Sequence, residues 1–159
     1  MTVEISPKSG LDWMKIGWWT QVVFTVIGLL DSIYLTWLKL SGELAACGGI
    51  GDCESVNASI YSRIVVKGVG EIPIALMGVV SYLLIFAFLR LELRDDAMGH
   101  WAPMVVFGLS LTGTLYSIYL TYIEIAVLRA ICPYCVVSAI AILVIFVISV
   151  ARMWRSNSQ

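Results

Sequence analysis

Four long apolar stretches, separated by short polar segments, dominate the pattern of the 159-residue chain. They cover about 16–40, 72–91, 101–127 and 132–150. A helix rises about 1.5 Å per residue, so about 20 residues cross a hydrocarbon core of about 30 Å. The pattern therefore predicts an all-α membrane protein, a bundle of four spanning helices that forms one domain over 1–159.

Composition supports the same class. Hydrophobic residues make up 60% of the chain and charged residues only 13%, which is typical of an integral membrane protein rather than a soluble globular domain. The formal net charge of −1 gives no basis for nucleic-acid binding.

An internal repeat indicates how the spans are organised. Segment 28–37 matches segment 113–122 at seven of ten positions, including a shared Ser-Ile-Tyr-Leu-Thr. The first and third spans are thus offset by 85 residues, while Pro73 and Pro133 align the second and fourth at an offset of 60. The 25-residue difference is an insertion in the first hairpin. We therefore expect two helical hairpins, repeated in the same membrane orientation.

The insertion, about 41–71, reads as an outer loop that carries two cysteines. Glycines between Cys47 and Cys53 make a pliable tether that would let one thiol reach the bundle. Farther along, four residues recur at helical spacing: Val56, Ile60, Arg63 and Ile64. This spacing predicts a short amphipathic helix at the membrane interface.

The other two cysteines open the last span, in the run Cys132-Pro133-Tyr134-Cys135. Proline suits the first turn of a helix, which puts Cys132 at the helix mouth and Cys135 one turn deeper. Unpaired backbone N–H groups and the helix dipole favour a thiolate at the mouth. The spacing therefore predicts a redox-active pair with Cys132 as the better nucleophile.

Two other roles for these cysteines stay open at this point. A Cys-x-x-Cys pair can be half of a zinc site, completed here by two ligands from Cys47, Cys53 and His100, or it can be inert packing. Redox chemistry is favoured because a charged, cysteine-rich metal centre would be poorly solvated at an apolar span. We therefore expect no metal.

Positive charge predicts the orientation. Six basic residues fall on one side of the predicted spans: Lys8, Lys15, Arg90, Arg94, Arg152 and Arg155. Four fall on the other side: Lys39, Arg63, Lys67 and Arg129. This bias favours cytoplasmic termini and puts the cysteines on the outer face of the cytoplasmic membrane, where disulfides persist.

Asp31 is an ionisable residue within the first span. Such residues are costly in a membrane and usually face the bundle interior. Two interpretations remain open: a proton route or substrate contact, or a structural carboxylate hydrogen-bonded to a neighbouring helix.

Two separated dithiol pairs suggest an electron relay by thiol–disulfide exchange. The chain has no Rossmann or P-loop glycine pattern and no histidine pair for haem. The acceptor that suits a hydrophobic four-helix pocket is a lipid-soluble quinone, either menaquinone or ubiquinone.

A set of motifs, in this order, carries a resemblance to a known family: Cys47 and Cys53, Ser59, Gly78 and Tyr82, the Tyr-Leu-Thr-Tyr of 119–122, and Cys132 to Cys135. Over essentially its whole length the chain resembles the bacterial form of the vitamin K epoxide reductase family.

This resemblance implies a role for each motif residue. Cys47 would meet a thioredoxin-like extracytoplasmic partner, and Cys53 would exchange with Cys132. Cys135 would face the quinone, and Ser59 would cap its pocket. The net reaction would move electrons from substrate thiols to quinone and support disulfide formation in exported proteins.

The chain also departs from its relatives. Animal members have an Asn near the position of Ile74 and a Tyr near that of Ala139, both implicated in holding vitamin K. With these apolar residues in the quinone site, reduction of the epoxide is not expected. Many bacterial relatives carry a fused thioredoxin-like domain, whereas this sequence stops at Gln159, so we expect the partner to be a separate protein.

Overall fold

Four long helices make up the protein in the computed structural model, which describes residues 8–42, 56, 59, 62–66, 70–94 and 97–156. They are α1 (Lys8–Ser41), α3 (Ile74–Leu91), α4 (Ala97–Ile123) and α5 (Pro133–Ser156), and a π-helix, η2 (Glu124–Leu128), continues α4. Each helix is long and apolar enough to cross a membrane. The predicted multi-pass bundle of four helices is confirmed.

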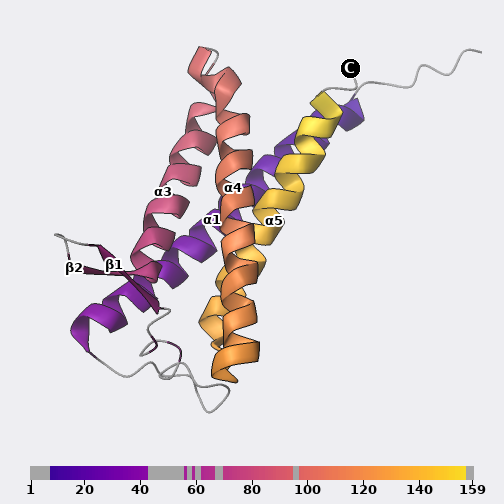
Figure 1. The fold of residues 1–159 in the computed structure, drawn as a ribbon. Coiled ribbons are helices and arrows are strands. Elements are labelled where there is room, and N and C mark those ends of the chain that lie inside the picture. The colour runs from indigo at the N-terminus through magenta and orange to yellow at the C-terminus, as the bar shows by residue number, and fades with distance from the viewer. Residues whose placement is uncertain are drawn as a thin grey trace, which may run out of the picture.

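The helices form two antiparallel pairs that pack on each other (Figure 1). The indole N–H of Trp18, near the start of α1, donates to the carbonyl of Leu89, near the end of α3, at 2.9 Å. The Gln21 amide donates to Ser149 Oγ, near the end of α5, at 2.7 Å. The start of α1 therefore lies at the same end of the bundle as the end of α5.

The sequence repeat corresponds to a close contact between helices that occurs once in each hairpin. A Cβ atom added to Gly28 on α1 would lie 2.2 Å from the ring of Tyr82 on α3. A Cβ atom added to Gly113 on α4 would lie 2.8 Å from Cγ1 of Ile142 on α5. The glycines differ by 85 positions and their partners by 60, the two offsets of the repeat. The two hairpins thus approach closely at equivalent points, as the duplication predicts.

Several polar side chains are buried between the helices, beside an apolar core that includes Ile85, Leu89 and Ile145. Gln21, Thr25 and Ser110 are fully buried, whereas Leu30 and Ile118 are largely exposed. The Thr25 hydroxyl donates to the Gln21 carbonyl one turn earlier, at 2.7 Å, so the buried hydroxyl has a hydrogen-bond acceptor. Small polar residues between helices and large apolar residues outside are the arrangement that lipid favours.

An ion pair joins three helices at the end of the bundle that holds the termini. Arg152 on α5 pairs with Glu92, which follows α3, and also donates to the Gln21 side chain on α1 at 2.6 Å. Arg152 lies twenty residues after Cys132, about 30 Å along a helix. This clamp and the cysteines therefore occupy opposite ends.

The first loop differs from its prediction. Val56, the first residue of the predicted amphipathic helix, is helical. Arg63 and Ile64 instead begin strand β1 (Arg63–Val66), which pairs antiparallel with β2 (Gly70–Pro73), so the extension of that helix through these two residues is wrong. The physical reason is the β-branched run that follows Arg63, which favours an extended backbone. The second span accordingly begins at Ile74 rather than at 72.

Candidate functional site

The Cys-x-x-Cys motif lies where the sequence predicts it. Pro133 is the first residue of α5, and the backbone N–H of Val136 donates to the Cys132 carbonyl at 3.1 Å, which starts the helical hydrogen bonding. Cys132 is 2% exposed and Cys135 is half-buried, and both are free thiols. Cys132 is therefore well shielded from solvent at the mouth of the helix, whereas Cys135 is only partly buried.

The two thiols are not equivalent. A hydrogen bond from the Cys135 side chain lowers the pKa of the Cys132 thiol below its ordinary value. The backbone amides of Cys135 and Tyr134 act in the same direction, while burial and the Glu124 carboxylate oppose them. Because the thiolate is the reacting form, this supports Cys132 as the better nucleophile of the pair.

A buried carboxylate holds the segment that precedes the cysteines. Glu124 is 5% exposed and begins the π-helix η2, which ends at Arg129 in the left-handed conformation, with φ of 50°. The carbonyl of Glu124 accepts a hydrogen bond from the Ala130 N–H at 3.1 Å, and its carboxylate accepts one from the Cys132 N–H at 3.3 Å. One residue thus fixes the turn from α4 into α5.

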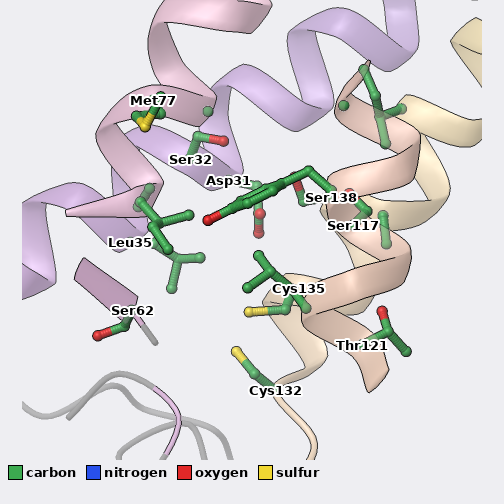
Figure 2. Close-up of a pocket in the computed structure, with 18 of the residues that line it drawn as sticks. Asp31, Ser32, Leu35, Ser62, Met77, Ser117, Thr121, Cys132, Cys135 and Ser138 are labelled. Carbon is green, nitrogen blue, oxygen red and sulfur yellow. The ribbon is translucent and has the colours of Figure 1, made fainter. Parts of the chain in front are cut away.

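A cavity of about 370 Å³ opens between the four helices beside the cysteines. Figure 2 shows the sulfur atoms of Cys132 and Cys135 on the same side of the start of α5, below Asp31 in this view. Most of the lining is apolar. Pockets of this size and character bind ring-shaped ligands, with a few polar groups fixing the orientation.

The predicted quinone-site residues Ser59, Ile74, Cys135 and Ala139 all line this cavity, and so does Cys132. Cys47 and Cys53, predicted as the outer redox pair, lie outside the described residues. The structure therefore brings together each predicted site residue that it describes.

Ser59 makes local hydrogen bonds in addition to lining the cavity. Its hydroxyl donates to the Val56 carbonyl at 2.8 Å, while its carbonyl accepts from the Ser62 hydroxyl at 2.8 Å. Lys39 on α1 in turn donates to Ser62 Oγ. This chain of contacts ties the described part of the first loop to the cavity wall.

Asp31 reaches the cavity from α1. Its Oδ2 atom is buried and has no hydrogen-bond partner among the residues that the structure describes. The Tyr82 hydroxyl, which lines the same cavity, instead donates to the Ser138 carbonyl at 2.9 Å. A structural role based on a hydrogen bond to Oδ2 is therefore not observed.

A comparison with known families bears on what this cavity binds. The model of the vitamin K epoxide reductase family matches residues 19–150, which is most of the chain. The chain belongs to the vitamin K epoxide reductase family. Membership implies a membrane thiol–disulfide oxidoreductase that works with a quinone.

The cavity fits the quinone that this family uses. It is large enough for a ring, it is mostly apolar, and Asp31 is among the few ionisable residues that line it. Within the described residues, no three His, Cys, Asp or Glu side chains come together as metal ligands. The electron-donating groups beside the cavity are therefore the two thiols of Cys132 and Cys135.

Sequence reasoning does not place Glu124 or Tyr82 in the cavity, although both line it. Glu124 was passed over because it lies at the end of an apolar span, although it occupies the repeat position of Lys39, and both line the cavity. Tyr82 was noted only as a family motif, and its contact with Ser138 joins α3 to α5. The signal available for Glu124 was a carboxylate eight residues before Cys132.

Proposed function

We propose that this protein is a thiol:quinone oxidoreductase in which Cys132 and Cys135 pass two electrons to a quinone bound in the four-helix cavity. The observation that carries the proposal is the opening of the dithiol helix α5 directly into a mostly apolar cavity. A bound quinone supplies a two-electron acceptor that takes up two protons on reduction. The chain supplies the thiols, the orientation and the exclusion of water.

The order of the two thiols follows from their surroundings. Cys132 is the residue at the helix mouth whose thiolate is favoured, which suits it to exchange with an incoming disulfide or thiol. Cys135 lies one turn deeper and faces the cavity, which suits it to the quinone. After each cycle the pair is left as a disulfide that must be reduced again.

Cys47 and Cys53 are proposed to supply those electrons. In this relay Cys47 exchanges with a separate thioredoxin-like protein, and Cys53 exchanges with Cys132. The partner then leaves oxidised and can introduce disulfides into exported proteins. The charge bias of the loops supports cytoplasmic termini and outward-facing cysteines in the cytoplasmic membrane.

The quinone site is proposed to combine apolar walls with one carboxyl group. Ile74 and Ala139 would contact the ring, Ser59 would cap it from the loop, and Asp31, in its protonated form, would donate a hydrogen bond from Oδ2 to a ring oxygen. A polar ligand atom at that place would give the buried Oδ2 the partner it lacks. With Ile74 and Ala139 apolar, we do not expect reduction of vitamin K epoxide.

The first experiment follows quinone absorbance in detergent-solubilised protein with dithiothreitol and a short-chain menaquinone or ubiquinone analogue. We expect quinone reduction in the wild type and none in Cys135→Ala. Val137→Ala is the matched control, because Val137 lies two residues on and is 42% exposed. A wild-type protein that is folded and reduces neither quinone would overturn the proposal.

Asp31 is tested in the same assay. Asp31→Leu should raise the KM for quinone roughly tenfold, the loss expected for one hydrogen bond to a carboxyl group. The rate of exchange with dithiothreitol should stay unchanged, since that step occurs at the cysteines. An unchanged KM would remove Asp31 from the site but leave the oxidoreductase intact.

A further inference from the structure

The Glu124 carboxylate lies in the cavity wall beside the redox pair. It accepts the backbone N–H of Cys132 at 3.3 Å, and Cys132 and Cys135 line the same cavity. Its charge also acts on the Cys132 thiol. Glu124 is thus a buried carboxylate in the wall of the cavity that also holds the two reactive sulfur atoms.

The backbone around Glu124 is built to keep the carboxylate there. A π-helix is rare, and a single turn of it within a longer helix occurs frequently at functional sites. Here the π-helix begins at Glu124, and the N–H groups of Arg129 and Ala130 both donate to the Glu124 carbonyl. The wider turn and its left-handed cap direct the chain back so that Cys132 meets the Glu124 side chain.

From this geometry we infer that Glu124 is the proton acceptor for the redox pair, taking the thiol proton of Cys135 as that sulfur becomes the electron donor. The inference rests on the proposed function and adds the residue that moves the proton. A thiol must lose its proton before its sulfur can attack, and a carboxylate held beside the dithiol by the Cys132 N–H is a suitable base.

The step balances over one turnover. At Cys135 the S–H bond breaks and an O–H bond forms on Glu124. A sulfur–sulfur bond then forms between Cys135 and Cys132, and two electrons leave the pair for the quinone. The proton held by Glu124 and the proton lost by Cys132 are delivered to the two oxygens of the reduced ring. Glu124 returns to its carboxylate, so a dithiol and a quinone become a disulfide and a hydroquinone.

Replacing Glu124 by Gln separates this role from a structural one. The Gln side chain keeps an oxygen to accept the Cys132 N–H but cannot act as a base. Removing the negative charge also removes one of the influences that oppose a thiolate at Cys132. The variant is therefore expected to have a more reactive Cys132 and a slower enzyme, two changes in opposite directions.

The experiment measures both quantities at one pH, in protein whose Cys47 and Cys53 are replaced by Ser. The first is the rate at which iodoacetamide alkylates Cys132 in the reduced protein without quinone, followed by peptide mass spectrometry. The second is quinone reduction driven by dithiothreitol. In Glu124→Gln we expect alkylation roughly threefold to tenfold faster and quinone reduction about 100-fold slower.

Two further variants control for damage to the fold. Glu124→Asp keeps a carboxylate and should recover part of the quinone reduction. Ile125→Ala shortens a 59% exposed side chain in the same π-helix and should leave both rates close to the wild type. Rates that fall together in Glu124→Gln, with no recovery in Glu124→Asp, would assign Glu124 a structural role and overturn the inference.

The outcomes for the inference and for the proposed function differ. If the wild type reduces quinone and Glu124→Gln matches it within twofold, the proton role is wrong and the oxidoreductase stands. If the folded wild type reduces no quinone, the function is overturned and the proton step with it. In that case an unchanged alkylation rate in Glu124→Gln would also disprove the effect of the carboxylate on the Cys132 thiol.

Discussion

The two hairpins share one plan, yet among the described residues the thiols that line the cavity come from the second hairpin. Ala75 on α3 occupies the repeat position of Cys135, and Ile72 on β2 occupies that of Cys132. Ala75 and Cys135 both line the cavity. The comparison teaches that the two halves contribute equivalent positions to the cavity wall. The second half differs in carrying the reactive cysteines Cys132 and Cys135.

The charged residues at the cavity mouth show the same division. Lys39 on α1 and Glu124 after α4 are equivalent in the repeat, and both line the cavity. Lys39 donates to Ser62 in the first loop, whereas Glu124 accepts the Cys132 N–H. The first hairpin thus uses this position to hold its loop, and the second uses it to hold the cysteines.

The largest expected effect comes from moving the dithiol to the other hairpin. In a Cys132→Ala, Cys135→Ala background, we introduce Ile72→Cys and Ala75→Cys. Quinone reduction should stay absent, because residue 72 belongs to a strand and Lys39, not a carboxylate, stands beside the new pair. Quinone absorbance measures the activity, and the melting temperature in detergent checks the fold. Recovery to within tenfold of wild type would show that the symmetric cavity alone suffices.

The close glycine contacts give the next effect. Gly28→Ala would push a Cβ atom into the Tyr82 ring. The Tyr82 hydroxyl is hydrogen-bonded to Ser138, so the ring cannot easily rotate away to remove the clash. Gly113→Ala meets the Ile142 side chain, which has nothing comparable to hold it. We expect losses of about 3 and about 1 kcal/mol, within the range for overpacking. Thermal unfolding in detergent measures both, and equal losses would contradict the difference between the halves.

Much of this fold follows from the sequence because its signals are long or local. The spans are set by some twenty consecutive apolar residues each, and Pro133 fixes the start of α5 through its own backbone geometry. The repeat also aligns Gly28 with Gly113, the two glycines at which a partner helix comes close. These features depend on the residues themselves and little on what packs beside them.

The remaining features depend on tertiary context. Residues 63–66 show a helical spacing at two positions, yet pairing with Gly70–Pro73 makes them a strand. Glu124 looks like the continuation of a helix, and only the turn toward Cys132 reveals a π-helix with a buried carboxylate. The unpartnered oxygen of Asp31 likewise emerges only when four helices enclose it.

A third prediction concerns the asymmetry within the dithiol. Because the Cys135 side chain lowers the pKa of Cys132, Cys135→Ala should move the alkylation of Cys132 to higher pH. The thiolate fraction grows as pH rises through the pKa, so near neutral pH the wild type reacts faster than the variant. The measurement is iodoacetamide labelling across pH, with Cys47 and Cys53 replaced by Ser. A midpoint that stays or falls would contradict the hydrogen bond.

The smallest effect tests a polar bridge between the two halves at the cavity, the Tyr82–Ser138 contact. The Tyr82 hydroxyl donates to the Ser138 carbonyl at 2.9 Å and lies 3.1 Å from its Oγ, whereas Ile142, the repeat partner of Tyr82, has no hydroxyl. Ser138→Ala removes only the second contact and should cost less than about 0.6 kcal/mol, the mean for a hydrogen bond between membrane helices. Tyr82→Phe removes both and should cost more. Thermal unfolding compares the two, and a larger loss in Ser138→Ala would mean that the serine hydroxyl, not the carbonyl, carries the bridge.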